Sequence, residues 1–173
     1  MDYKLLTAVL ASRLNEAIAP LVGALQPGFL AGRFIVDNVI LIRDYLAWVR
    51  EHRQQRGLIF LDFQKAYDRV RWNWLWKVMA HIGLEGRILL LTQACYYSNP
   101  QVRLLLEGIS MGLLHPTRGV RQGCPLSPLL FALSIEPLHH RLSRDPALTG
   151  VVLPRRDDGS RPPQPSSTRF ALR

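Results

Sequence analysis

The sequence predicts an α+β fold, in which a small antiparallel sheet packs on helices. Apolar residues recur with helical spacing in residues 4–22 and 36–53 and again in the second half of the chain. Strand patterns lie between the helices, as four consecutive apolar residues at 58–61 and as alternation at Val102, Leu104 and Leu106. The expected strands are 58–62, 101–107 and 112–118, and the helices on one side of them are 73–83, 86–98 and 128–143.

The composition indicates a packed chain with a basic surface. The 173 residues are 48% hydrophobic, which suffices for one domain with a core. The formal charge is +9, and 19 of the 22 basic residues are arginine. Arginine favours phosphate because its planar fork donates two hydrogen bonds at once, so the balance fits a nucleic-acid partner. A coding bias towards arginine would give the same count.

Several classes of protein are excluded. Cys95 and Cys124 lack the spacing of a zinc site or a disulfide framework. No apolar stretch is long enough to span a membrane. An export signal at Leu5–Ala11 is rejected because Asp2 precedes it and the same pattern continues past Arg13. The expected location is intracellular, with nucleus and cytoplasm both open.

Two amphipathic helices are expected at the N-terminal end. The inward residues of the first helix, 4–22, are Leu6, Leu10, Leu14, Ala17, Ile18 and Leu21. Those of the second, 36–53, are Val36, Val39, Ile40, Leu46 and Val49. Its outward arginines (Arg43, Arg50 and Arg53) read as a solvated face rather than a binding patch. Between the helices, Gly28 and Gly32 beside Arg33 predict a turn, and glycines so placed would also permit close approach to a phosphate.

The run Leu58–Leu61 delivers Asp62 and is too short for a helix, so we expect a strand buried on both faces. Asp62 then either ends that strand or, held rigidly at its tip, serves as an oxygen ligand for Mg²⁺. Asp68 caps the following helix or orients the turn. Asn73 is the expected cap of that helix and Gly83 its end. One or two of the neighbouring tryptophans should anchor it in the core.

The second half of the chain contains a loop followed by a helix. Gly119 and Gly123 flank the loop, and Ser127 with Pro128 predicts an N-cap and first turn. Alone, this is a structural corner or an anion-binding one. Residues 154–173 are rich in Pro, Arg and Ser without periodicity and predict a disordered tail. The pair Asp157-Asp158 is rejected as a metal site because no strand would hold it still.

Five stretches, in the same order as in the family, resemble the reverse transcriptases of LINE-type (non-LTR) retrotransposons, and three of them carry its most specific motifs. These are Asp62-Phe-Gln-Lys65-Ala-Tyr67-Asp68, Gly119-Val-Arg-Gln-Gly-Cys-Pro-Leu-Ser-Pro128, and the Gln26-to-Asn38 segment with Gly28, Gly32 and Arg33. The resemblance covers about residues 3–153. It departs at Phe34, where a serine is usual, and at Cys124, where an acidic residue is common.

The resemblance implies the fingers and partial palm of a right-hand polymerase. Residues 1–56 would be a fingers-like helical segment, 57–153 a partial palm and 154–173 the tail. The implied partners are an RNA template, a DNA primer and dNTPs without a membrane, and the implied cofactor is Mg²⁺. Asp62 would be the catalytic, metal-binding carboxylate, and the Phe63 carbonyl a second metal contact. The nucleotide-binding residues would be Lys65, Ala66, Tyr67, Gln122 and Gly123.

Within that set, Tyr67 would lie beneath the nucleotide sugar and exclude a 2′-hydroxyl by its bulk. Arg33 and Arg121 would contact nucleic acid. The family also needs a later Phe/Tyr-Ala-Asp-Asp hairpin, and here Leu172 and Arg173 follow Phe170-Ala171. The expectation is therefore a reverse transcriptase fragment that is inactive as given, lacking the aspartate pair and the thumb. The alternative is a non-catalytic remnant that binds RNA or DNA.

Overall fold

The structure is a computed structural model that describes residues 2–23, 26, 28–97 and 102–148. It contains both helices and strands, as expected for an α+β chain. In chain order the elements are α1 (Asp2–Ile18), α2 (Ile35–Glu51), the 3-10 turn η1 (Tyr67–Arg69), α3 (Trp72–His81), α4 (Arg87–Tyr97), β1 (Val102–Leu106), β2 (Ile109–Leu114) and α5 (Ser127–Arg144). The expected tail, residues 154–173, lies outside the described residues.

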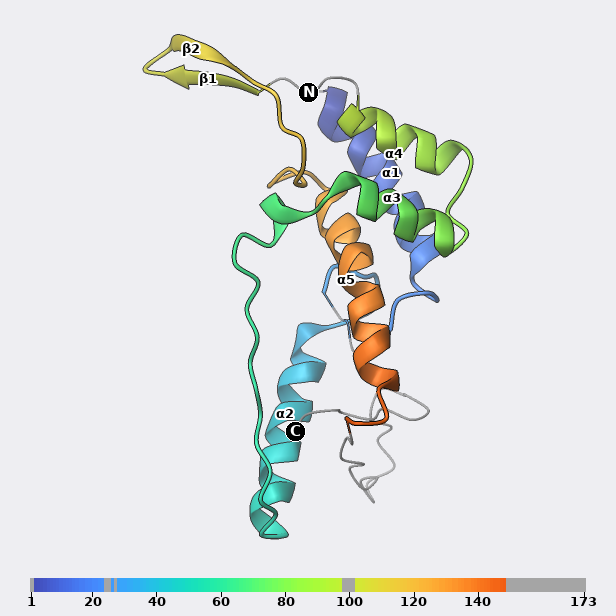
Figure 1. The fold of residues 1–173 in the computed structure, drawn as a ribbon, viewed down its shortest axis with the longest axis vertical. Coiled ribbons are helices and arrows are strands. Elements are labelled where there is room, and N and C mark those ends of the chain that lie inside the picture. The colour runs from blue at the N-terminus through green and yellow to red at the C-terminus, as the bar shows by residue number, and fades with distance from the viewer. Residues whose placement is uncertain (1, 24–25, 27, 98–101, 149–173) are drawn as a thin grey trace.

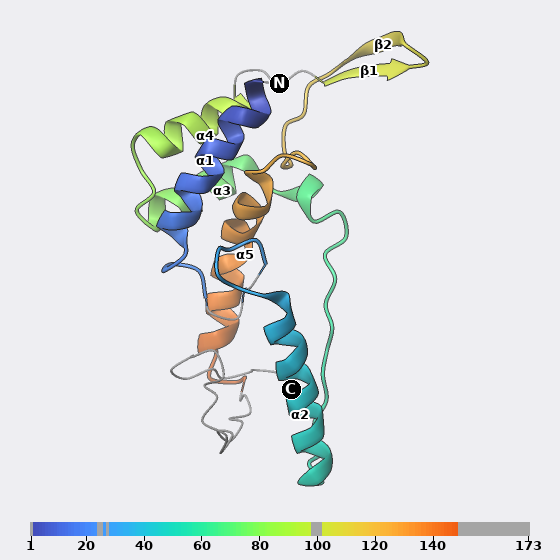
Figure 2. The same ribbon diagram turned by 180° about the vertical axis from the view of Figure 1, so that it is seen from behind.

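Helices α1, α3, α4 and α5 pack into one helical body, as both views show (Figures 1 and 2). All four supply core residues, and two loop residues, Val70 and Val120, join them. The fully buried members include Leu14, Ile18, Leu75, Met79, Tyr96, Leu126, Leu130 and Leu133. Each such leucine contributes roughly 1.5–3 kcal/mol of transfer free energy. None of the described helices is long and apolar enough to cross a membrane.

Helix α1 confirms the first expected helix but with a shifted buried stripe. The buried positions are Thr7, Leu10, Leu14 and Ile18, spaced three or four residues apart. Leu6 is exposed because it lies one residue off this stripe, and Leu21 is exposed because the helix has already ended. Buried Thr7 satisfies its hydroxyl by donating to the Tyr3 carbonyl at 2.9 Å, so a polar residue is tolerated in the stripe.

Helix α3 ends as the sequence predicts but begins differently. Gly83 has φ +82°, its N–H donates to the Ala80 carbonyl, and the Leu84 N–H donates to Met79, which is a Schellman ending. The predicted cap at Asn73 is wrong, because the helix starts at Trp72 after Arg71. The prediction that tryptophans anchor this helix is confirmed, since Trp72 and Trp76 are buried.

The predicted inward face of the second helix is wrong. Helix α2 forms, but none of its residues is buried, and Val36 and Val39 are more than half exposed. In both views α2 extends away from the helical body, and residues 54–66 run back beside it (Figures 1 and 2). Hydrogen bonds join the two: the Gln54 N–H donates to the Val49 carbonyl at 3.0 Å, and the Tyr45 hydroxyl donates to the Gly57 carbonyl at 3.4 Å. Helix α2 is therefore amphipathic, but its apolar face packs against no other element in the described structure.

The predicted sheet is only partly confirmed. β1 and β2 form an antiparallel hairpin, but every residue in both strands is exposed and the hairpin projects from the helical body (Figure 1). Residues 58–62 form no strand, and Phe60 and Leu61 are each 78% exposed. A strand needs neighbours to pair its N–H and C=O groups, and the described residues offer this segment none.

Helix α5 starts one residue earlier than a serine cap would allow. The capping position is Leu126, and Ser127 is the first helical residue, fully buried, with no side-chain cap bond. The predicted N-cap at Ser127 is therefore wrong. Pro128 in the first turn is confirmed, since its missing N–H would be unpaired there in any case.

Candidate functional site

The two strongest sequence motifs lie side by side in the structure. We call residues 62–70 the aspartate turn and residues 118–126 the glutamine loop. The Gly119 N–H donates to the Val70 carbonyl at 2.7 Å, and the Val120 N–H donates to the Tyr67 carbonyl at 2.9 Å. Val70 and Val120 are both buried in the core. Main-chain hydrogen bonds therefore join segments about fifty residues apart in sequence and anchor both to the helical body.

Gly119 is required at this junction by its backbone. Its φ is +92°, a region that L side chains rarely adopt. A Cβ there would lie 3.1 Å from the Asp68 carbonyl oxygen and 3.2 Å from the Asp68 Cα. The Gly119 carbonyl also accepts a 2.7 Å hydrogen bond from the Trp72 indole. The N–H of Gly119 thus binds the aspartate turn, and its carbonyl binds helix α3.

Aromatic contacts place the aspartate turn on helix α5. The Tyr67 ring lies 5.2 Å from the Phe131 ring, and Phe63 meets the same ring edge-on at 6.2 Å. Tyr67 is half-buried, and this burial raises the pKa of its hydroxyl above the ordinary value. A neutral, firmly packed ring can act as a steric wall, which is the property that the resemblance requires of Tyr67.

Asp62 lies at the start of the turn and is exposed. Because the expected strand 58–62 is absent, nothing of that kind holds its carboxylate rigid. The described residues contain no group of three His, Cys, Asp or Glu side chains that could hold a metal ion. Mg²⁺ needs near-octahedral oxygen ligation, so this part of the chain does not fit a magnesium ion on its own.

Two further residues of the turn, Lys65 and Ala66, are predicted to bind the nucleotide. Lys65 is exposed with φ +53°, a left-handed conformation that costs a non-glycine residue about 1–2 kcal/mol. Ala66 beside it is half-buried. The Lys65 carbonyl accepts a hydrogen bond from the Arg69 N–H at 3.1 Å, which closes the turn. Lys65, the residue with this strained backbone, is one of the predicted nucleotide-binding residues.

The predicted contacts of the glutamine loop are also exposed. Gln122 and Gly123 face solvent, and Gly123 has φ +76°. Arg121 places its guanidinium 4.5 Å from the centre of the Tyr3 ring while remaining exposed. This stacking fixes one end of the side chain to α1. A separate hollow, lined by residues of α1, Phe29 and the start of α5, contains none of the predicted site residues.

Beneath the glutamine loop lies a buried polar cluster. The Cys124 Sγ and the Tyr3 Oη are 3.8 Å apart, and the Tyr96 and Ser127 hydroxyls are 3.5 Å apart. Burial alone would raise the pKa of the Cys124 thiol, but hydrogen bonds from the Leu126 N–H and neighbouring hydroxyls bring it below its ordinary 9.0. These hydrogen bonds favour a negative charge on the Cys124 sulfur.

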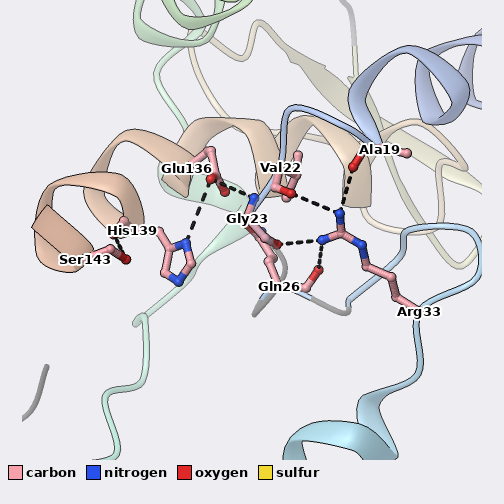
Figure 3. A network of polar contacts seen from close by, with 8 residues as sticks. All are labelled: Ala19, Val22, Gly23, Gln26, Arg33, Glu136, His139 and Ser143. Carbon is pink, nitrogen blue, oxygen red and sulfur yellow. Dashed lines mark hydrogen bonds and ion pairs between the residues drawn. The ribbon is translucent and has the colours of Figure 1, made fainter. Parts of the chain in front are cut away.

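The Arg33 side chain points back to the main chain of its own loop, whereas the resemblance predicts that it contacts nucleic acid. Its two terminal nitrogens donate to four main-chain carbonyls, those of Ala19, Val22, Gly23 and Gln26 (Figure 3). The four distances lie between 2.6 and 3.1 Å. The guanidinium therefore binds the chain just past the end of α1, and a nucleic-acid contact by Arg33 stays a prediction.

Sequence reasoning missed the residues that hold this site together. Phe131 receives both aromatic rings of the turn, and the Trp72 indole fixes Gly119. Glu136 of α5 accepts the Gly23 N–H at 2.9 Å. Phe131 could have been found from its position, because it lies three residues after Pro128, the last residue of the second motif string, on the same helix. Nothing in the sequence marks the pairing of Glu136 with Gly23.

With this geometry described, the family can be stated. Residues 1–153 match the reverse transcriptase (RNA-dependent DNA polymerase) family. The match covers both joined motifs and the segment carrying Arg33. The chain therefore belongs to the reverse transcriptase family.

Named relatives place it among retrotransposon proteins. It is 35% identical over 155 residues to the transposon TX1 uncharacterized 149 kDa protein of Xenopus laevis, covering 88% of this chain and 11% of that protein. It is 29% identical over 150 residues to a Pol polyprotein of element R2 from Popillia japonica, covering 86% and 21%. The R2DM polyprotein of Drosophila melanogaster is 31% identical over 133 residues, covering 77% and 12%. The chain thus spans between a tenth and a fifth or so of these relatives.

Substituting Gly119 should break the junction. Gly119→Ala introduces a Cβ against the Asp68 backbone at a positive φ, so we expect a loss of about 2–3 kcal/mol in the free energy of unfolding. Gly83→Ala is the matched control, since Gly83 also has positive φ but open space around it. Urea unfolding measures both. Equal losses for the two variants would show that the contact with Asp68 carries no weight.

The buried Tyr96 should make the fold sensitive to alkali. Burial raises the pKa of Tyr96 from 10.0 to about 12, so its contribution to stability is complete below pH 10 and is lost as pH rises towards 12. At about 1.4 kcal/mol per pKa unit, we expect the wild type to lose about 2 kcal/mol more than Tyr96→Phe across this interval. Denaturant titrations at stepwise pH test this. Parallel curves for the two proteins above pH 10 would contradict it, while parallel curves between pH 7 and 9 are expected.

Proposed function

We propose that this chain is the fingers and partial palm of an RNA-directed DNA polymerase and that it forms the corner against which the incoming nucleotide packs. The observation that carries the proposal is the pair of main-chain hydrogen bonds joining Val70 to Gly119 and Tyr67 to Val120. They bring together the two motifs to which the resemblance assigns nucleotide contacts. Membership of the reverse transcriptase family supports the substrate class.

The proposed roles follow from where each residue lies. Tyr67, packed on Phe131, is the wall beneath the sugar that excludes a 2′-hydroxyl. Lys65 and Ala66 stand at the tip of the turn, where an exposed cation can meet a triphosphate. Gln122 and Gly123 provide the exposed edge of the glutamine loop, and no Cβ at Gly123 obstructs a base. Binding and orientation of the nucleotide are the functions of these residues.

The chemical step needs more carboxylates than this corner supplies. Two-metal nucleotidyl transfer requires ligands from several backbone segments. Asp62, with the Phe63 carbonyl beside it, is one such contribution, yet the described residues contain no group of three ligating side chains. We therefore assign no step to a metal here, and propose that this chain binds its substrates without extending a primer.

Positive charge around the corner favours a nucleic-acid partner. Arg69, Arg71, Arg118 and Arg121 flank the two joining hydrogen bonds and are all exposed. Within the described part of the chain none of the four forms an ion pair, so their charge is not neutralised there. Exposed arginines in such a group bind phosphates and make affinity depend on salt. A non-catalytic RNA-binding role is the alternative function, and this charge favours it equally.

Primer extension separates the two functions. With a primed homopolymer RNA, dNTPs and Mg²⁺, we expect binding by the 173-residue chain and no incorporation above a protein-free background, because the described residues contain no group of three ligating side chains. Incorporation that disappears in Asp62→Asn would contradict the proposed inactivity and identify an active polymerase. Absence of any binding to primed RNA would contradict the substrate class itself.

Arg121 should contribute one phosphate contact. Replacing it as Arg121→Gln should lower the slope of log affinity against log salt by about 0.7 to 0.9 for primed RNA, the share of one neutralised phosphate. Arg50→Gln, an exposed arginine on α2 with the same change of charge, is the matched control and should leave the slope unchanged. Fluorescence anisotropy at several salt concentrations measures it. A slope that falls equally in both variants would mean that charge acts without a defined site.

A further inference from the structure

Arg33 lies at a point where three parts of the fold meet. Helix α1 ends at Ile18, and the chain past it would leave carbonyl groups without helical partners. Arg33 reaches back from the following loop to these carbonyls: its Nη1 is 2.6 Å from the Gly23 oxygen and its Nη2 is 2.7 Å from the Ala19 oxygen. A positive charge near a helix C-terminus is favourable in itself.

All the N–H donors on the two terminal nitrogens of the Arg33 guanidinium are hydrogen-bonded. Its two terminal nitrogens carry four N–H groups, and four carbonyls accept from them. To bind a phosphate through the same fork, Arg33 would have to release these carbonyls. Lysine could not replace it, because an ammonium is a point charge with three donors and no planar fork.

One peptide group links Arg33 to helix α5. The carbonyl of the Val22–Gly23 peptide accepts from Arg33 at 2.9 Å, and the N–H of the same peptide donates to Glu136 Oε1 at 2.9 Å (Figure 3). The guanidinium and the carboxylate thus polarise one peptide from opposite sides, which strengthens both hydrogen bonds. Glu136 is mostly buried, with a side-chain exposure of 15%.

Gly23 fits this link because it has no side chain. A Cβ at Gly23 would lie 2.9 Å from the His139 ring and 3.2 Å from Glu136 Oε1. The loop and α5 are therefore in direct contact at this residue. His139 Nδ1 also lies 3.8 Å from the same Glu136 oxygen, on the outer side of the contact (Figure 3).

We propose that Arg33, Gly23 and Glu136 form a clamp that positions the segment entering α2 against helix α5, and that Arg33 is a positioning residue rather than a phosphate ligand. The expected effect of this clamp on the binding of primed RNA rests on the proposed function. The clamp itself does not. Arg33 acts through the Val22–Gly23 peptide, so its loss changes geometry and leaves the number of phosphate contacts intact.

The test compares Arg33→Lys and Arg33→Gln with Arg13→Lys, an exposed arginine on α1. We expect both Arg33 variants to lower the melting temperature by about 5–10 °C, since several hydrogen bonds to a charged group are lost. For primed RNA we expect Kd to rise about tenfold in both, with an unchanged salt slope, because no phosphate contact is removed. Arg13→Lys should change neither quantity.

A phosphate ligand would behave in the opposite way. Arg33→Lys would then retain Kd within about threefold, and Arg33→Gln would lower the salt slope by about 0.7 to 0.9. Either result overturns the proposal. The double variant Arg33→Gln/Glu136→Gln should lower the melting temperature by less than the sum of the single changes, because both residues hold one peptide. Additive losses would overturn the link to α5.

A measurement on the wild-type chain does not depend on the variants folding. The terminal guanidinium protons of Arg33 should give slowly exchanging NMR signals that persist when primed RNA is added. Their loss or a large shift on addition of RNA would overturn the clamp. If the wild type binds no primed RNA, the proposed function fails, while the melting temperatures, the double variant and these signals still decide the clamp.

Discussion

Two main-chain hydrogen bonds, from Gly119 to Val70 and from Val120 to Tyr67, are the constraint on which the site depends. These two bonds hold the motifs together in place of the expected sheet, because residues 58–62 form no strand. Because backbone atoms make these bonds, the side chains matter mainly where they allow the two backbone segments to come close together or anchor them in the core. That explains a glycine at 119 and valines at 70 and 120, whose side chains enter the core.

The elements that could be predicted from sequence are those whose causes are local. Gly83 ends α3 because a left-handed residue is needed there, and the periodicity of residues 87–97 appears as α4. The failures are tertiary. The apolar side chains of α2 and of residues 58–61 predict burial, but burial needs a partner surface that the described residues do not provide. The caps expected at Asn73 and Ser127 are also wrong, since the capping positions are Arg71, two residues earlier, and Leu126, one residue earlier.

The candidate site was predictable as a set of motifs and not as a set of contacts. The strings around Asp62 and Gln122 indicate the family, and the family match over residues 1–153 bears that out. That Tyr67 packs on Phe131, or that Trp72 holds Gly119, depends on how α3 and α5 meet in space. Arg33 is the sharpest case: a residue with the right neighbours for phosphate contact makes four hydrogen bonds to its own main chain.

The β1–β2 hairpin has apolar residues on both faces and two open edges. Its pairing slips between Leu104 and Leu105, where Gly112 faces the first and Ser110 the second, so Met111 is an extra residue on β2. Such a bulge sharpens the local twist and bends the strand that carries it. A bent, strongly twisted edge is a poor template for another chain, so this irregularity protects an otherwise adhesive ribbon from growing into intermolecular sheets.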